Sequence, residues 1–238
     1  IYQFLKKLRK DLNFPKTNYS SDNNKNDIFI SHCPERVLPG NIIYELYNND
    51  RIIGGITKTC SSKASKFYEK FIKGKTILTN AKTAELSKLS ENSFRDVNIA
   101  FANELSMICD ENNVNVWDLI KIANMHPRVN ILEPGPGVGG HCIAVDPWFL
   151  TYSNPKTSKL INIARLVNIN KEIFVYKKIN RLLKDYSKNI SDITIACLGI
   201  TFKANVSDLR GSPSLSIIKK LIKKQLKKIN IVEPNISK

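Results

Sequence analysis

One cysteine of this chain lies in a setting suited to nucleophilic chemistry. Cys142 follows four glycines within residues 135–140, and it precedes Asp146 by four residues. Glycine has no Cβ, so the backbone can approach a ligand closely there, and a thiol in a glycine-rich turn stays reachable. A carboxylate at this spacing can orient a water or hold a proton beside the sulfur. The alternative is a glycine-rich loop in which Cys142 merely packs, and the local pattern favours neither interpretation.

A long helical pattern between residues 82 and 112 carries a second polar group. This stretch contains neither glycine nor proline. Lys88, Asn92 and Arg95 are spaced i, i+4, i+7, so they project from one face of the helix. A solvated polar stripe would have the same spacing. However, apolar residues are distributed widely around this helix, so much of its surface must be covered by flanking domains or by a second subunit.

Three further segments combine polar residues with turns. Residues 31–40 follow an expected strand, and loops at the carboxyl ends of parallel strands bind ligands in many α/β folds. The alternative interpretation of this segment is a proline-rich turn with a surface salt bridge. His126-Pro127-Arg128 precedes the cysteine loop by some fifteen residues. The third segment, residues 199–213, follows a strand and leads into a helix that Pro213 can start.

The composition limits the class of protein. The chain has 238 residues, enough for one large or two small domains, and 42% of them are hydrophobic, which suffices for a core. No apolar run approaches the ~20 residues that a membrane span requires, and no signal peptide is recognisable. The five cysteines lack a close-spaced framework, which fits a reducing compartment. We therefore expect a cytoplasmic protein with no membrane partner.

The net charge of +16 raises the question of nucleic-acid binding. Only eight of the 37 basic residues are arginine, and the lysines are scattered, whereas a nucleic-acid surface clusters arginines and interleaves aromatics. We expect no nucleic-acid partner. Four of the arginines fall in the segments singled out above: Arg36, Arg95, Arg128 and Arg210. A planar guanidinium can donate two hydrogen bonds side by side to a phosphate or a sugar, which lysine cannot do.

The order of the expected elements indicates incomplete α/β units around a helical centre. Strands are expected at 27–31, 51–55, 75–78, 192–199 and 228–233, and helices at 1–12, 61–71, 82–112, 116–123, 159–183 and from Pro213. The first strands suggest part of a parallel sheet, and the strand at 192–199 reads as buried. Neither end can bury both faces of its sheet alone, so we expect the chain to be a fragment.

No dinucleotide-binding fingerprint is recognisable. Residues 135–140 match the letters G-x-G-x-x-G, but prolines stiffen their approach, and the residues that follow do not read as the start of a helix. We therefore expect the 238 residues alone to bind NAD⁺ weakly and to be inactive.

The cysteine loop, residues 134–149, resembles the active-site loop of the UDP-sugar 6-dehydrogenases, in the UDP-glucose/GDP-mannose dehydrogenase superfamily. Residues 31–40, 88–95, 126–128 and 199–213 are also similar to segments of that family. Cys-Pro-Glu-Arg-Val-Leu-Pro-Gly at 33–40 and Val145 before Asp146, where UDP-glucose enzymes typically have Lys, resemble the branch that acts on UDP-N-acetyl-D-mannosamine. Gly211 departs from the pattern, since the family usually has Glu there.

The resemblance implies an α/β fold in three parts. Residues 1–80 would be the C-terminal half of an NAD-binding Rossmann-like domain. Residues 81–187 would be a central helical domain that forms a homodimer through its long helix. Residues 188–238 would be the first strand–helix–strand of a second, UDP-binding Rossmann-like domain. The implied reaction oxidises the C6 alcohol of a UDP-sugar twice with NAD, in surface polysaccharide synthesis, and UDP-glucose and UDP-N-acetylglucosamine remain alternative substrates.

The resemblance also implies roles for individual residues. Cys142 would form the thiohemiacetal and thioester, Lys88 and Asn92 would stabilise the oxyanion, and Asp146 and Glu35 would activate water. The residues implied to bind the substrate are Lys88 and Asn92 again, with Arg36, Val37, Arg95, His126, Arg128, Gly139 and Lys203. Cys142 and Arg210 would lie beside the cofactor.

Two interpretations from other classes remain open. The pairs His32–Cys33 and His141–Cys142 together contain the ligands of a Cys₂His₂ zinc site. Adjacent His-Cys ligands strain a tetrahedral geometry, so we expect no metal. The other possibility is an inactive module that only dimerises through the long helix.

Overall fold

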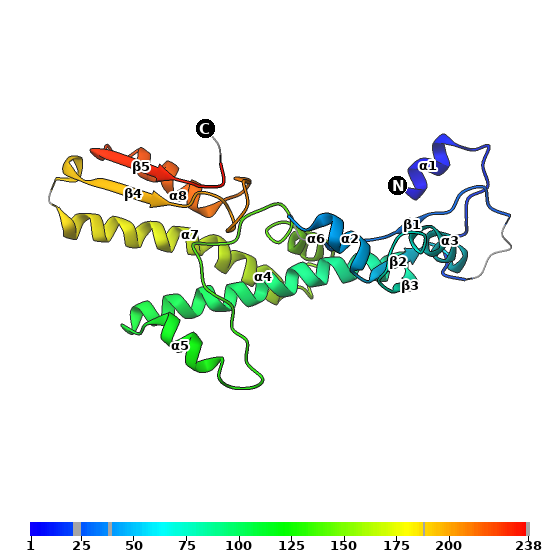
Figure 1. The fold of residues 1–238 in the computed structure, drawn as a ribbon, viewed down its shortest axis with the longest axis horizontal. Coiled ribbons are helices and arrows are strands. Elements are labelled where there is room, and N and C mark those ends of the chain that lie inside the picture. Colours follow the sequence, from blue (N-terminus) through cyan, green and yellow to red (C-terminus); the bar gives the residue numbers. More distant parts are fainter. Residues whose placement is uncertain (21–24, 38–39, 188, 237–238) are drawn as a thin grey trace. The chain divides into compact units, whose positions relative to one another are not determined.

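The computed structural model describes residues 1–20, 25–37, 40–187 and 189–236 (Figure 1). Leu38 and Pro39, part of the segment 31–40 considered above, lie outside the described residues. The chain forms two compact units, Ile1–Ser90 and Glu91–Lys238, and each is described by itself.

The N-terminal unit contains a small mixed sheet in the order β1-β2-β3. Its elements are α1 (Tyr2–Leu8), β1 (Ser31–His32), α2 (Ile42–Asn48), β2 (Arg51–Gly55), α3 (Lys58–Tyr68) and β3 (Thr76–Asn80). β2 and β3 are parallel, with Ile53 opposite Leu78, and α3 connects them. The Thr57 side chain caps α3 by accepting a hydrogen bond from the Cys60 N–H. The expected β2–helix–β3 arrangement is therefore confirmed.

The first strand departs from the expectation. We expected it at residues 27–31 in a parallel sheet, but β1 covers only Ser31–His32 and pairs with β2 in the antiparallel direction. Pro34, two residues after the end of β1, has no N–H to continue a ladder, which limits the strand at that end.

Two long helices dominate the C-terminal unit. Its elements are the larger part of α4 (Ala81–Glu111), then α5 (Val116–Ala123), α6 (Asp146–Ser153), α7 (Lys159–Tyr186), the 3₁₀ turn η1 (Ile190–Asp192), β4 (Thr194–Leu198), α8 (Pro213–Ile222) and β5 (Lys228–Val232). The expected helices at 82–112, 116–123 and 159–183 are confirmed within three residues at each end. Within the described residues, no helix is both long and apolar enough to cross a membrane.

The end of the chain forms one parallel strand–helix–strand unit, as expected. β4 and β5 pair in register, with Cys197 opposite Ile231, and Figure 1 shows α8 between this sheet and α7. Leu183 of α7 packs with Ile217 and Leu221 of α8 in one apolar core. The expectation that 192–199 is a buried strand is wrong, because alternate residues of β4 are exposed.

The buried face of α4 is unusually polar near its centre. Asp96 and Asn103 are fully buried, next to the small side chains of Ala100 and Ala102. Phe94, by contrast, is 72% exposed in this chain. The sequence predicted that the apolar side chains of this helix need a cover, and the single chain does not supply it for all of them.

Candidate active site

Cys142 lies in a turn that leads into α6. Its carbonyl oxygen accepts hydrogen bonds from the N–H groups of Val145, at 3.0 Å, and Asp146, at 2.8 Å. Pro147 stands in the first turn of α6, where its missing N–H costs no helical hydrogen bond. Our expectation that the residues after the glycines open no helix is therefore wrong, although α6 begins only at Asp146, six residues beyond Gly140.

The glycines before Cys142 allow another loop to approach. A Cβ on Gly139 would lie 2.5 Å from the Gly211 carbonyl oxygen, and Gly140 has a φ of +86° with its backbone against the Phe202 ring. The Gly140 N–H donates to the Arg210 carbonyl at 3.0 Å. The loop 199–212 is thereby fixed against the cysteine loop. Gly139 itself is buried, so contact between the two loops explains its lack of a side chain.

Accessibility distinguishes Cys142 from the other cysteines. All five lie in the described part of the chain, and Cys142 alone is exposed. Cys60 and Cys109 are buried, whereas burial raises the pKa of Cys33 and Cys197. Because the thiolate is the reactive form, the other four are poorer nucleophiles than an exposed thiol in a turn.

Two of the predicted catalytic residues touch each other. The Asn92 side-chain N–H donates to Asp146 Oδ2 at 2.5 Å, which joins α4 to the first turn of α6. Both side chains are half-buried, and Asp146 follows Cys142 by one helical turn. Lys88 lies one turn before Asn92 on α4, is half-buried, and belongs to the N-terminal unit by its contacts.

A cavity of about 410 Å³ adjoins the cysteine loop in the C-terminal unit. Three residues predicted to bind the substrate line it: Arg95 from α4, Gly139 from the cysteine loop, and Lys203 from the loop 199–212. Phe202 and Ile143 contribute apolar surface. The exposed cations of Arg95 and Lys203, next to this apolar surface, suit a ligand that carries both a negative charge and a flat ring.

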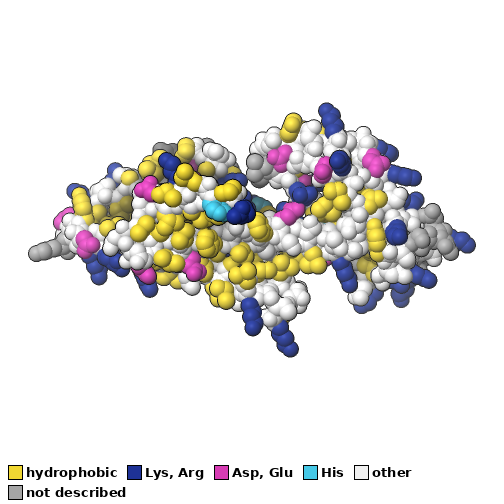
Figure 2. Space-filling view, turned by 90° about the horizontal axis from the view of Figure 1, so that it is seen from below, with side chains coloured by type: hydrophobic (Ala, Val, Ile, Leu, Met, Phe, Trp, Pro, Cys, Tyr) yellow, Lys and Arg dark blue, Asp and Glu magenta, His cyan; other side chains and the backbone are white. Residues whose placement is uncertain are grey.

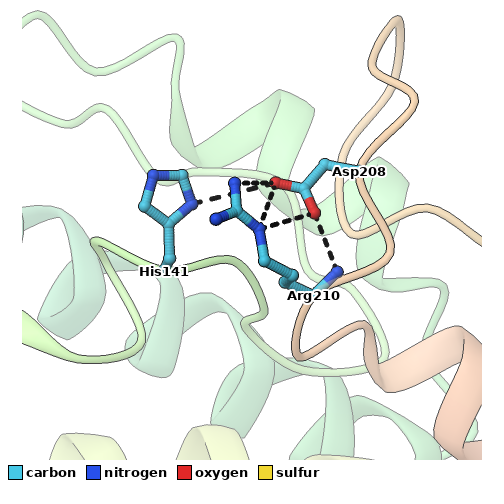
Figure 3. Close-up of polar contacts among 3 residues, drawn as sticks. All are labelled: His141, Asp208 and Arg210. Atoms are coloured by element: carbon cyan, nitrogen blue, oxygen red, sulfur yellow. Dashed lines mark hydrogen bonds and ion pairs between the residues drawn. The ribbon is translucent and has the colours of Figure 1, made fainter.

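Arg210, His141 and Asp208 form a charged cluster beside Cys142 (Figure 3). Arg210 Nε and Nη2 donate to the Asp208 carboxylate at 3.0 and 2.6 Å, and His141 Nδ1 lies 3.8 Å from Asp208 Oδ2. The hydrogen bonds from Arg210 lower the pKa of Asp208 to about 2. Sequence reasoning predicted Arg210 and missed Asp208, which fixes the direction of its guanidinium.

Glu35 lies in the N-terminal unit, directly after β1. Its carboxylate accepts a hydrogen bond from Arg51 Nη1 at 2.9 Å, while 52% of its side chain is exposed. Partial burial raises the pKa of Glu35, but hydrogen bonds from Arg51 and from the Arg36 N–H outweigh this effect and lower it. Arg51 is 3% exposed and lies over the Tyr68 ring. Sequence reasoning missed Arg51, whose hydrogen bond from Nη1 favours the ionised form of Glu35.

The other predicted residues are not among those that line this cavity. Arg36 and Val37 follow Glu35 in the N-terminal unit. His126 and Arg128 lie exposed in the loop after α5, where the Arg128 N–H donates to His126 Nδ1 at 3.3 Å. The structure therefore brings together Asn92, Arg95, Gly139, Cys142, Asp146, Lys203 and Arg210, and it does not bring His126 and Arg128 to them.

The two His-Cys pairs that suggested zinc belong to different units, since Cys33 lies in Ile1–Ser90 and Cys142 in Glu91–Lys238. Within the ranges that the structure describes, no three His, Cys, Asp or Glu side chains gather as metal ligands.

Three family models match the chain in succession. Residues 9–72 match the NAD binding domain of the UDP-glucose/GDP-mannose dehydrogenase family, residues 82–172 its central domain, and residues 196–238 its UDP binding domain.

Curated relatives and solved structures are similar over nearly the whole chain. A UDP-N-acetyl-D-mannosamine dehydrogenase of Campylobacter jejuni is 56% identical over 98% of this chain and 56% of its own length. An NDP-N-acetyl-D-galactosaminuronic acid dehydrogenase of Ralstonia nicotianae is 53% identical, over 99% of this chain and 54% of its own. A solved UDP-D-ManNAc dehydrogenase of Pyrococcus horikoshii superposes with a TM-score of 0.86 at 38% identity, covering 99% of this chain and 54% of that one.

The chain thus spans about half the length of the curated relatives it matches. The family matches and the structural likeness confirm the predicted order: part of an NAD-binding Rossmann domain, a central helical domain, and the start of a UDP-binding domain. The chain belongs to the UDP-glucose/GDP-mannose dehydrogenase family.

Proposed function

We propose that the protein with this chain is an NAD-dependent 6-dehydrogenase that oxidises the C6 alcohol of UDP-N-acetyl-D-mannosamine to the uronate. One observation carries the proposal: exposed Cys142 stands one turn before Asp146, whose carboxylate is hydrogen-bonded to Asn92. A nucleophile, an amide donor and a carboxylate at one place are what acyl chemistry on a thiol needs.

The residues present fit NAD as the cofactor. β2 and β3 end at the same edge of their sheet, and the N-terminus of α3 follows β2, which is where such folds bind dinucleotides. In the C-terminal unit, Arg210 would hold the cofactor beside Cys142. We propose the domain boundaries 1–80, 81–187 and 188–238 for the NAD-binding, central and UDP-binding parts.

NAD⁺ supplies a hydride acceptor for each of the two oxidations. The first oxidation converts the C6 alcohol to an aldehyde and releases a proton. The Cys142 thiolate then adds to the aldehyde carbon, and the carbonyl π electrons move to oxygen. Lys88 and Asn92 donate hydrogen bonds to this thiohemiacetal oxygen.

The second oxidation converts the thiohemiacetal to a thioester on Cys142. Water then attacks the thioester carbon while Asp146 and Glu35 take its proton, and the carbon–sulfur bond breaks to release the uronate and the thiolate. The balance is one alcohol, two NAD⁺ and one water converted to one carboxylate, two NADH and three protons. The ionised form of Glu35, which Arg51 favours, is the form that accepts a proton.

The cavity next to Cys142 supports a nucleotide-sugar substrate. Arg95 and Lys203 provide cations for a diphosphate, and the backbone of Gly139 forms part of the wall between them. We assign Arg36, Val37, His126 and Arg128 to the same substrate, the last two from across a dimer interface. The names of the C. jejuni and R. nicotianae relatives, both of acetamido-sugar enzymes, support an acetamido substrate over UDP-glucose.

A homodimer through α4 is part of the proposal. Phe94, Phe101 and Ile108 recur every seven residues and are 72%, 57% and 48% exposed, so they form one apolar stripe along the helix. Figure 2 shows hydrophobic side chains gathered in the region of α4 and α5. Free cysteines and a sugar-nucleotide substrate agree with a cytoplasmic enzyme that supplies surface polysaccharide synthesis.

The test is Cys142→Ser in the full-length enzyme, with Cys197→Ser as the control because Cys197 lies on β4. We expect the serine at 142 to reduce uronate formation by about 10³-fold or more, since an alkoxide forms far less readily than a thiolate. The control should keep wild-type turnover. NADH formation is followed in parallel with UDP-N-acetylmannosamine, UDP-N-acetylglucosamine and UDP-glucose. Undiminished turnover by Cys142→Ser would refute the assignment, and equal use of UDP-glucose would refute the acetamido substrate alone.

A further inference from the structure

Both ends of the cysteine loop are hydrogen-bonded to side chains buried between the two long helices. At the first end, the Gly135 N–H donates to Asn103 Oδ1 at 2.8 Å, from α4. At the second end, Arg165 Nη1 on α7 donates to the Ile143 carbonyl at 3.3 Å. Cys142 lies between these two attachment points, next to the second.

The two attachment points are joined by a continuous series of hydrogen bonds. Asn103 donates to Asn168 Oδ1 at 2.8 Å, and Asn168 donates to Asp96 Oδ1 at 2.8 Å and to the Asp96 carbonyl at 3.0 Å. Asp96 Oδ1 also accepts from Arg165 Nη1 at 3.0 Å. The four side chains are between 0 and 2% exposed. We call them the buried polar network: Asp96, Asn103, Arg165 and Asn168.

A network of this kind allows little movement. Each donor that loses its partner here has no water to replace it, which costs about 1–3 kcal/mol per neutral group and more for a charge. Helix–helix packing alone could be achieved with apolar side chains of similar volume. Apolar side chains could not make the hydrogen bonds to the loop backbone at residues 135 and 143.

We propose that the buried polar network consists of positioning residues, which hold the cysteine loop so that the Cys142 thiol stays aligned with Asn92 and Asp146. The glycines leave the loop many backbone conformations, and the two attachments select one of them. This inference rests on the proposed function, in which Cys142 is the nucleophile. The network touches neither the substrate nor the sulfur, so it acts through the loop alone.

The test variant is Asn103→Leu, which keeps the volume and removes the attachment of Gly135. A displacement of the nucleophile by about 1 Å costs on the order of 100-fold in rate. We expect kcat to fall by about 100-fold, while KM for the UDP-sugar changes less than about threefold because Arg95 and Lys203 remain in place. In the 238-residue chain, amide hydrogen exchange at residues 135–145 should accelerate by about 100-fold.

Two further variants separate positioning from loss of stability. Asn103→Asp should restore kcat to within about threefold at pH 6, because a buried carboxyl whose partners are the neutral Asn168 and Gly135 is protonated there and then donates to Asn168 and accepts from Gly135. Leu183→Ala removes core packing near α8, far along the chain from the loop, and should lower the urea midpoint of unfolding without changing kcat. If Asn103→Leu does not fold, Asn103→Ala replaces it, since alanine also removes the oxygen that accepts the Gly135 N–H.

Several outcomes would overturn the inference. One is an unchanged kcat in folded Asn103→Leu, another is a kcat loss of equal size in Leu183→Ala, and a third is no recovery in Asn103→Asp. Full turnover by Cys142→Ser would instead refute the nucleophile and hence the proposed function. Loss of turnover in Cys142→Ser with normal turnover in Asn103→Leu would refute the positioning role only.

Discussion

Replacing Arg165 by Met tests whether the buried polar network carries a paired charge. Arg165 is 2% exposed and its Nη1 lies 3.0 Å from the Asp96 carboxylate, which is fully buried. Met fills a similar volume, so little apolar contact is lost, but the carboxylate loses its counter-charge. Breaking a buried ion pair in this way costs about 3–5 kcal/mol. We expect the free energy of unfolding to fall by that amount at neutral pH.

The cost should depend on pH in a defined direction. Burial already raises the pKa of Asp96, against the opposing effects of Arg165 and Asn168, so loss of Arg165 raises it further. At a pH between the folded-state pKa of Asp96 in the wild type and its higher value in the variant, only the variant takes up a proton on folding. The stability of the variant therefore rises as the pH falls through this interval. The difference from wild type should therefore shrink by about 1.4 kcal/mol per pH unit in that interval. It should be largest above both values.

Urea unfolding followed by tryptophan fluorescence measures this effect. Both tryptophans, Trp117 and Trp148, lie in the unit Glu91–Lys238, so the signal reports on the part that contains the network. The control is the double variant Arg165→Met with Asp96→Asn, which removes both charges and should recover most of the loss. A cost that stays constant between about pH 5 and pH 8, or a double variant no more stable than Arg165→Met, would refute the reasoning.

Two further predictions concern the base and the subunit interface. Arg51→Met should raise the pKa of Glu35, since Arg51 holds that pKa below its ordinary value. The acid limb of the pH–rate profile for uronate release should therefore move to higher pH. An acid limb that does not move would contradict the pairing of Arg51 with Glu35. Phe101→Glu should convert the dimer to a monomer, because a charge would interrupt the apolar stripe, whereas the exposed Tyr186→Glu control should not. Sedimentation at matched concentrations decides, and a dimeric Phe101→Glu variant would exclude this face.

The long helical patterns could be predicted because their signal is redundant. α5 has the bounds expected from the sequence, 116–123, and α8 begins at the expected Pro213. α2 was not predicted, since seven residues are too short a stretch to establish a helical period. α6 was missed for a different reason. Asp146-Pro147 is a helix-start signal, but a turn separates it from the last glycine, so the helix does not begin where a dinucleotide fingerprint would place it.

The residues of the candidate site were easier to predict from the sequence than the residues that support them. Cys142, Asn92 and Asp146 are small sets of reactive groups with recognisable spacing. Asp96 and Arg165 fall within amphipathic patterns where charged residues are nearly always solvated, so their burial could not be expected. The sequence held one clue to this burial. Arginine is scarce in this lysine-rich chain, so each arginine that remains is expected where lysine cannot replace it. This applies to the buried Arg51 and Arg165 as well as to the four arginines singled out above.

The continuity of α4 follows from the three tasks that its faces perform. Asn92 faces α6, Asp96 and Asn103 face α7, and Phe94 and Phe101 face outward. Each residue step turns a helix by about 100°, so an insertion or deletion of one residue would rotate the side chains beyond it away from the partners that they contact. A kink at a glycine or proline would change the direction of every side chain beyond the kink. An uninterrupted helix is therefore required, because the same register must serve the Asn92 amide, the buried polar network and the apolar stripe.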